Sequence, residues 1–421
     1  MPSNIKLRLS VFMFLQYFTW GCWYASMGAY LTNTLKFTGG EIGLAYGAFA
    51  VGAMISPFFV GLVADRYFAT EKLLGVLGVL GGVLLVLLPR MTAFPPFYAL
   101  LIVYCATYVP TLALGNSLSL HQLPDAKKDF PQVKVLSAVG WVAAGLVVTA
   151  CQAEQVALQF YLAGATSVVL GLYSLTLPHT PPKKVGENVP LREILGLDAL
   201  GLLRKPSFAI FIGCMFLICI PLYFYFVNVG IYLTESGWPN FARALTLAQV
   251  SDVVFLLLLP LMLHRLGYKK TIALGIIAWA TRYFLLAQSV NAATLATSFI
   301  IGAILLHGVC YDFLFIAGQL YVDEECNERM RGAAQGFIAF ILWGVGAFVG
   351  TLLAGKVMEA HVLAEPVNGF VHDWHAIWRI PAWGAVGVLA VFALFFRGPG
   401  KGLSEAVEEE EVLVVADDPA V

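Results

Sequence analysis

Charged residues are scarce in this chain of 421 amino acids. Lys, Arg, Asp and Glu make up 12% of it, about half the share found in soluble globular proteins. So little charge cannot cover a water-facing surface of this size, which excludes an ordinary soluble protein. The formal net charge of −1 also excludes a nucleic-acid partner, since such binding needs a basic surface. With 59% hydrophobic residues and a mean hydropathy of +0.80, the composition indicates an integral membrane protein.

Motifs for catalysis and metal binding are also lacking. The sequence has no CxxC pair, no Cys/His spacing suited to zinc and no nucleophile with a supporting base. We therefore expect no enzyme activity, no metal and no cofactor apart from a proton as coupling ion. The seven cysteines are predicted to be reduced and buried, and to serve as small hydrophobic residues.

Long apolar runs are what the chain does have. A helical span needs about 20 apolar residues, and twelve runs satisfy this. They cover residues 9–31, 42–63, 73–89, 97–120, 132–152, 156–177, 207–233, 245–263, 271–288, 294–321, 334–355 and 376–396. We predict an all-α integral membrane protein of twelve transmembrane helices. Its parts are a six-helix half (1–177), a cytoplasmic central loop (178–206), a second six-helix half (207–396) and an acidic, disordered cytoplasmic tail (397–421).

Basic residues predict the orientation. Cytoplasmic loops carry an excess of Lys and Arg. If the N-terminus is cytoplasmic, 18 of the 25 Lys and Arg residues lie in inside loops and five in outside loops. We therefore expect a multi-pass protein of the cytoplasmic (inner) membrane with both termini cytoplasmic.

Two basic, glycine-containing loops lie at equivalent places in the two halves. The first reads Gly61-Leu-Val-Ala-Asp65-Arg66 and the second spans residues 264–270. Such duplication predicts a transporter whose site lies between the halves. The first loop resembles the signature loop of the major facilitator superfamily, which implies that superfamily's fold. We predict that Asp65 and Arg66 form a gating loop.

Four ionisable residues interrupt the apolar runs, namely Lys134, Asp252, Arg282 and Asp312. Each costs about 2.5–3.5 kcal/mol on membrane-insertion scales, so each is a candidate for function. Asp312 lies deepest, and a carboxylate there suits proton coupling. The alternative is that Asp312 is a buried structural partner of Arg282 or of another polar group. Arg282 is itself better explained as a salt-bridge partner than as a residue facing the cavity.

Helical spacing places aromatic and polar side chains on common faces. The groups are Gln16 with Trp20 and Trp23, Lys134 with Trp141, Gln249 with Asp252, and His307 with Tyr311. Aromatic faces with amide, carboxylate and ammonium groups suit a flat polar ligand such as a nucleobase on a sugar. For the two tryptophans of the first group, packing at the membrane interface is as good an interpretation.

Short motifs in a fixed order extend the resemblance over nearly the whole chain. They include Leu15-Gln16-Tyr17, Tyr108-Val109-Pro110-Thr111 with Asn116, Asp129-Phe130-Pro131, Tyr311-Asp312-Phe313 and Ala334-Gln335-Gly336. By these motifs the sequence resembles the nucleoside:H+ symporters, the bacterial nucleoside permeases of the major facilitator superfamily. The resemblance implies proton-driven nucleoside uptake by a monomer that alternates between inward-open and outward-open states.

Site residues follow from this resemblance together with the faces above. The substrate-binding set is Lys134, Trp141, Tyr223, Gln249, Asp252, Tyr311, Asp312, Gln16 and Asn116, and the proton-coupling set is Asp312, Asp252 and His307. The chain departs from the family where an arginine is replaced by Lys134, a threonine by Ala138 and a tyrosine by His307. An amide-bearing stretch is also replaced by the aromatic run Tyr223–Phe226. A symporter for a sugar or modified nucleoside, or a receptor with a transport fold, therefore stays open as an alternative.

Overall fold

The computed structural model describes residues 2–59, 67–182, 197–292, 294–326, 328–367 and 369–398. The described chain is almost entirely helical. This is the expected outcome for apolar segments in lipid, because a helix satisfies its backbone hydrogen bonds internally where no water is present. The predicted gating residues Asp65 and Arg66 and the acidic tail beyond Gly398 lie outside the described residues.

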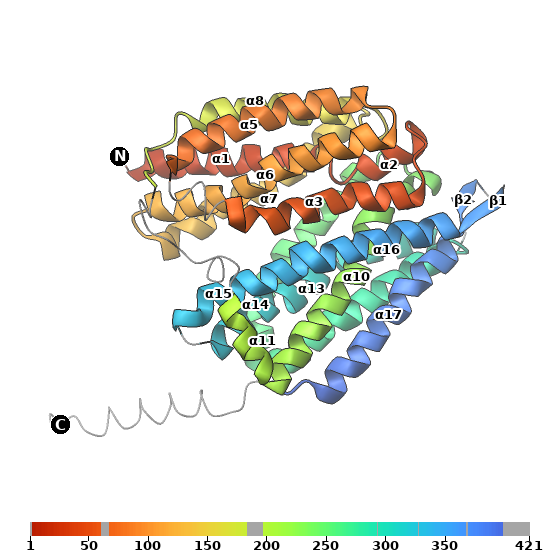
Figure 1. The fold of residues 1–421 in the computed structure, drawn as a ribbon. Helices are drawn as coiled ribbons and strands as arrows, with labels where there is room; N and C mark the ends of the chain where they lie inside the picture. The colour runs from red at the N-terminus through yellow and green to blue at the C-terminus, as the bar shows by residue number, and fades with distance from the viewer. Residues whose placement is uncertain are drawn as a thin grey trace, which may run out of the picture.

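The first half consists of seven helices in the described residues, gathered in the upper part of Figure 1. They are α1 (Pro2–Gly21), α2 (Met27–Asn33), α3 (Gly39–Phe59), α5 (Thr70–Leu87), α6 (Phe94–Gln122), α7 (Ala126–Ala150) and α8 (Leu158–Ser174). The first apolar run is thus divided between α1 and α2. A 3₁₀ turn, Leu88–Arg90, extends α5.

A 3₁₀ segment, Leu197–Arg204, lies within the predicted central loop and precedes the second half, which occupies the lower part of Figure 1. Its helices are α10 (Pro206–Glu235), α11 (Phe241–Ser289), α12 (Ala296–Leu305), α13 (His307–Tyr311), α14 (Ala317–Glu325), α15 (Glu328–Ala339), α16 (Ala347–Ala360) and α17 (Trp374–Phe395). Single π-helical turns at Asp312–Ile316 and Phe340–Gly346 join α13 to α14 and α15 to α16. The long α11 is two helices in one, because Gly267 leaves the helical conformation (φ 71°).

Each predicted apolar run overlaps at least one helix, but the predicted number of spans is not confirmed. In the described residues, seven helices are long and apolar enough to cross a membrane, or eight if the bent pair Ala296–Leu305 and His307–Glu325 is one span. Two features account for part of the difference from twelve. The 49-residue α11 covers two predicted runs, and α8 has only 17 residues.

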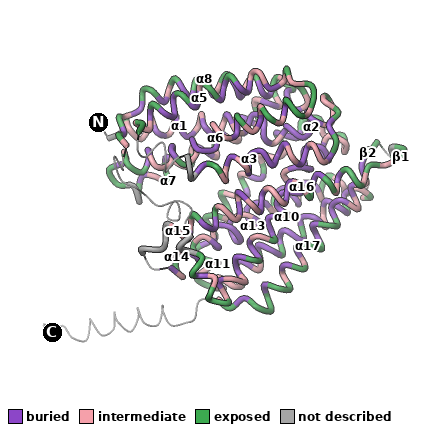
Figure 2. The backbone as a smooth tube through the Cα atoms, in the orientation of Figure 1, coloured by how far each residue is buried: buried purple, intermediate pink, exposed green. Residues whose placement is uncertain are grey.

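Buried and exposed residues alternate along the helices (Figure 2), and many of the exposed ones are large and apolar. Leu257 and Leu394 are 76% and 75% exposed. Patches of this kind are rare on soluble monomers and are typical of a surface that contacts lipid.

Glycine contacts bring helices together within the first half. A Cβ on Gly78 of α5 would lie 2.7 Å from the Cα of Gly171 in α8, and one on Gly82 would lie 2.7 Å from the Gly164 carbonyl oxygen. Small residues spaced by four allow this close approach of two backbones.

The two halves meet at the end of the molecule opposite the N-terminus, where α3 runs beside α16 (Figure 1). A Cβ on Gly355 would collide with the carbonyl oxygen of Gly39 and would lie 2.7 Å from the Cα of Gly43. This end, which we call the closed end, therefore has no room for a passage between α3 and α16.

Each half also caps a helix of the other at the closed end. The Glu359 carboxylate accepts a hydrogen bond from the Gly40 N–H at the start of α3 (3.0 Å). The Thr149 hydroxyl accepts one from the Arg243 N–H at the start of α11 (3.1 Å) and donates to Glu154. The first turn of a helix has free N–H groups that need such partners.

A short β-hairpin, absent from the prediction, also lies at the closed end. Strands β1 (Val362–Val367) and β2 (Phe370–His372) pair antiparallel between α16 and α17. The Glu235 carboxylate at the end of α10 accepts hydrogen bonds from the backbone N–H of Val371 and His372 and from the Trp374 indole. This single buried carboxylate fastens the hairpin to the second half.

One cysteine departs from the prediction. Cys151 is exposed, because it follows the last residue of α7 at the closed end, where the chain turns toward α8. The other six are buried as expected.

Candidate functional site

Lys134 of α7 is the polar centre of the first half. Its ammonium group donates to the Tyr17 hydroxyl of α1 (2.9 Å) and to the Asn116 side-chain oxygen of α6 (3.1 Å). It also lies 4.6 Å from the centre of the Tyr17 ring. An ammonium group has three N–H donors, so one stays available for a ligand. Two predicted residues, Lys134 and Asn116, are thus brought together, and Tyr17 joins them.

An aromatic wall adjoins this cluster. Trp20 stacks on Phe49 of α3 at 4.7 Å and meets the ring of Trp141 edge-on at 5.3 Å. Tyr17 of α1 and Tyr24 of the turn after α1 flank Trp20, with ring centres 5.9 and 5.5 Å away. Its rings lie at different angles to one another, and the exposed ring faces suit stacking with a planar ligand.

Gln16 occupies a different position from the one expected of a ligand-binding residue. It is 1% exposed, and its amide nitrogen donates to the Thr111 hydroxyl (3.0 Å). The Tyr108 hydroxyl donates to its backbone oxygen. These contacts tie α1 to α6, so binding of substrate by Gln16 stays a prediction. Trp23 is also buried and packs on Tyr104 inside the protein, not at the membrane interface.

Two carboxylates form the polar centre of the second half. Asp312 is 1% exposed and begins the π-helical turn, and Asp252 lies on α11. The two interact electrostatically with each other and with the Tyr311 hydroxyl. One oxygen of each, Asp312 Oδ2 and Asp252 Oδ1, is buried with no hydrogen-bond partner among the described residues. Unpartnered buried carboxylate oxygens are costly and mark a place that a proton or a ligand fills.

His307 and Tyr311 lie on one face of α13, one turn apart, with their rings stacked at 6.0 Å. Tyr311 extends toward Phe315 and Trp343, which continue the aromatic surface. The His307 Nδ1 atom is buried without a partner in the part of the chain that the structure describes.

Among the described residues, Arg282 does not form the salt bridge expected of it. The guanidinium is fully buried, lies 4.3 Å from the ring centre of Tyr225 and 4.8 Å from that of Trp279, and donates from Nε to the Ala303 carbonyl oxygen. Neither of its terminal nitrogens has a hydrogen-bond partner among the described residues. Stacking on aromatic rings replaces a carboxylate here, because these rings attract a desolvated cation. The Asp312 carboxylate is therefore not occupied by Arg282.

The two centres face each other across the halves. Tyr17 of the first half lies near Tyr311 of the second, and Tyr24 lies near Tyr223. The Tyr24 and Phe226 rings lie 6.1 Å apart. Tyr223 is buried and Gln249 is half-buried. The arrangement offers one ammonium group and aromatic rings on the side of the first half, and carboxylates and aromatic rings on the side of the second.

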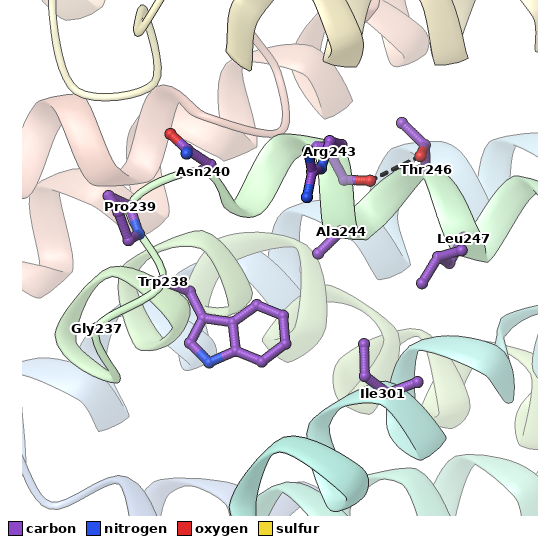
Figure 3. A pocket seen from close by; sticks show the side chains of 9 residues that line it. All are labelled: Gly237, Trp238, Pro239, Asn240, Arg243, Ala244, Thr246, Leu247 and Ile301. Atoms are coloured by element: carbon purple, nitrogen blue, oxygen red, sulfur yellow. Dashed lines mark hydrogen bonds between the residues drawn. The ribbon is translucent and has the colours of Figure 1, made fainter. Parts of the chain in front are cut away.

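An open cavity of about 450 Å³ lies beside this site, lined on α6 by Ala113, Asn116, Ser117, Leu120 and His121. It extends from the Lys134 partner Asn116 toward the end of α6 that lies away from the closed end. A larger cavity of about 570 Å³ lies elsewhere, between the start of α11 and Ile301 of α12 (Figure 3). Arg243 and Trp238 line it at the closed end, and no predicted site residue does.

The expectation from sequence missed Tyr17 and Trp343. In the sequence, Tyr17 stood out only as the neighbour of Gln16. One more tyrosine is not distinctive in a chain where 13% of residues are aromatic. Its spacing of three from Trp20 places it on the aromatic face, and this is the signal that could have found it.

Two groups of helices that close at one end around opposed polar centres define a transporter of the major facilitator type. The fold is similar to the crystal structure of the nucleoside transporter NupG, with a TM-score of 0.85 at 28% identity, covering 94% of this chain and 100% of that one. The chain matches the nucleoside H+ symporter family over residues 3–401 and belongs to it. Relatives in Escherichia coli (strain K12) include the protein YegT (37% identity, 93% of each chain) and the xanthosine permease (30% identity, 94% of this chain and 96% of that one).

Proposed function

We propose that this protein imports nucleosides together with protons across the cytoplasmic (inner) membrane. Family membership makes nucleoside:H+ symport the expected activity. The observation that supports it most directly is the carboxylate pair Asp312 and Asp252. Each has a buried oxygen without a partner among the described residues, opposite an aromatic wall and an ammonium group.

The substrate lies between the two centres in this proposal. Its base stacks against Trp141 and Tyr311, and its polar groups bond to the free donor of Lys134, to Gln249 and to a carboxylate. A lysine offers a point charge where arginine would offer a planar fork, so hydroxyl groups of the sugar are better partners for Lys134 than a bidentate acceptor.

The conformation is inward-open in this proposal. It follows from the predicted orientation, in which the N-terminus is cytoplasmic and the closed end therefore faces outward. Twelve spans, both termini cytoplasmic, action as a monomer and gating by Asp65 and Arg66 belong to the same proposal.

Coupling follows from the charge of the carboxylate pair. Two negative charges in a desolvated site repel each other, so binding of one proton stabilises the loaded site. A proton can shift the inward–outward equilibrium only through different affinities in the two states. In this proposal the proton binds to Asp312, with Asp252 and His307 beside it. Its affinity for the proton changes because the contacts around these side chains differ between the inward and outward states.

The test is uptake of radiolabelled nucleoside into proteoliposomes with an imposed pH gradient, inside alkaline. We expect accumulation that collapses when a protonophore removes the gradient, and loss of accumulation in Asp312→Asn. Glu365→Gln, on the exposed strand β1, is the matched control for a neutralised carboxylate. Uptake that ignores the gradient, or survives unchanged in Asp312→Asn, contradicts the proposal.

A symporter for another polar metabolite is the second candidate. It is favoured by the aromatic run Tyr223–Phe226, which stands where the family has amides. Competition of labelled nucleoside uptake by sugars and by modified nucleosides separates the two, since a sugar does not need the aromatic wall. Binding without accumulation would favour a receptor.

A further inference from the structure

The helix that carries His307, Tyr311 and Asp312 is broken immediately before them. The segments Ala296–Leu305 and His307–Glu325 are bent by 42° at this break. A break in a membrane helix frees backbone donors and acceptors, and in lipid they must find partners within the protein. The backbone groups that the break leaves without a partner in their own helix are the Leu305 carbonyl oxygen and the Gly308 N–H.

One side chain from another helix satisfies both groups. The Ser251 hydroxyl of α11 donates to the Leu305 carbonyl oxygen and accepts from the Gly308 N–H at 3.0 Å. A hydroxyl has one donor and two acceptor positions, so it can serve as both at once. Ser251 is 5% exposed, which leaves little opportunity for water to take its place.

The two backbones touch at the same point. A Cβ on Gly308 would collide with the Ser251 carbonyl oxygen and would lie 2.9 Å from the Asp252 nitrogen. The crossing of α11 with the broken helix is therefore a tight joint, made of the Ser251 hydroxyl and the glycine surface of Gly308.

The residues of the proton-coupling set flank this joint on both helices. Asp252 directly follows Ser251, His307 directly precedes Gly308, and Asp312 follows Gly308 by one helical turn. The π-helical turn that begins at Asp312 is a second irregularity of the kind that occurs at functional sites.

We propose that Ser251 is a positioning residue for proton coupling, which holds the carboxylates of Asp252 and Asp312 at the separation that their shared titration requires. This role rests on the proposed symport function and specifies how the site is held. Ser251 itself touches neither proton nor substrate. It acts by fixing the bend of the helix that carries Asp312 relative to the helix that carries Asp252.

Several groups share the electrostatic environment that the joint controls. The two carboxylates lie close enough to repel each other, and both lie near the Tyr311 hydroxyl, as does Tyr17. His307 lies near the positive charge of Arg282. The Tyr225 ring of α10 lies 6.3 Å from the His307 ring. A change of bend moves Asp312 and His307 relative to all of these groups, and so changes the pH at which the site takes up its proton.

The experiment compares Ser251→Ala with Ser251→Thr, which keeps the hydroxyl. Ser119→Ala is the matched control, because Ser119 is also buried but its hydroxyl donates to Gly115 of its own helix. Each variant is tested for gradient-driven nucleoside accumulation, for nucleoside counterflow without a gradient, and for the pH dependence of its melting temperature without substrate.

We expect Ser251→Ala to lose at least about tenfold in gradient-driven accumulation, the effect of leaving one buried backbone group unpartnered. We expect counterflow to persist in this variant. When melting temperature is plotted against pH, the pH at the midpoint of the change, here called the pH midpoint, should shift. Ser251→Thr recovers the midpoint of the wild type, and Ser119→Ala never leaves it. Equal loss of accumulation and counterflow with an unchanged midpoint in Ser251→Ala overturns the positioning role.

Failure of the symport function gives a different pattern. In that case the wild type itself shows no gradient-driven nucleoside uptake, while the pH midpoint still reports whether Ser251 sets the titration of the carboxylates. Should Ser251→Ala fail to fold, Ser251→Cys, with a weaker donor, replaces it, and an unshifted midpoint in that variant counts against the proposal.

Discussion

Gly355→Ala directly probes the closed end of the molecule. The added methyl carbon would collide with the Gly39 carbonyl oxygen and would lie 2.7 Å from the Cα of Gly43. Ordinary contacts between carbon atoms begin near 3.5 Å, so α3 and α16 must separate by about 1 Å. Both obstructing atoms are backbone atoms, which cannot move aside by rotating a side chain.

The magnitude follows from the cost of overpacking, about 1–3 kcal/mol for extra atoms in a close-packed interface. That cost falls only on the conformation in which this end is closed. The ratio of closed to open molecules at this end should therefore fall by about 5-fold to 150-fold. Alanine is also a better helix former than glycine by about 1 kcal/mol, so the melting temperature need not fall with transport.

Spin labels on Lys36 of the first half and Val362 of the second, both exposed at the closed end, measure the separation by pulsed electron resonance. We expect a new population at longer distance in Gly355→Ala, together with slower nucleoside uptake. Gly387→Ala is the control, because nothing lies within 4 Å of its added Cβ and it gains the same helix propensity. Unchanged distances and unchanged uptake in Gly355→Ala would refute the conclusion that this contact keeps the end closed.

Three further predictions concern single charges. Asp312→Asn should abolish gradient-driven accumulation and spare counterflow, since an amide cannot exchange a proton; paired uptake and counterflow assays check this. Lys134→Met should raise the KM for nucleoside about tenfold, the typical effect of losing one hydrogen bond to a charged group, and Lys134→Arg should raise it less. The check is the KM for nucleoside uptake, with Glu365→Gln as the control. Equal KM values for Lys134→Met and Lys134→Arg would contradict this prediction. Burial raises the pKa of Glu154, so the folded protein holds this proton more tightly than the unfolded chain, and stability is lost as pH rises from the unfolded pKa to the folded one. Glu154→Gln should flatten the melting temperature across that window, and an unaltered pH profile would count against it.

The helices were predictable because lipid imposes one simple rule on a membrane segment. An apolar run must form a helix, and every predicted run overlaps one. The breaks were not predictable from hydropathy, because Leu305 and Leu306 are as apolar as their neighbours. What permits the break there is the Ser251 hydroxyl, which comes from a helix about 50 residues earlier and only meets Leu305 after folding.

In the site, too, some features could be predicted from the sequence and others could not. Lys134 and Asp312 were found because a charge in an apolar run is costly enough to need a reason. The partner of a charge was harder to predict. Arg282 was expected to find a carboxylate, and it stacks on Tyr225 and Trp279. The choice depends on which faces α10 and α11 present to each other.

Contacts at the closed end and in the middle of the membrane differ in how easily they can be exchanged. At the closed end, Glu359 and Thr149 cap helices of the opposite half through backbone N–H groups. These groups lie at helix starts next to solvent, so water can replace the caps when the halves part, and their loss costs little. The Ser251 joint lies beside the buried coupling groups, where burial keeps water out, and its loss leaves backbone groups unpartnered. Contacts that water can replace therefore lie between the halves. The Ser251 joint, which water cannot replace, lies within the second half, between the two helices that keep Asp252 and Asp312 together while the halves rock.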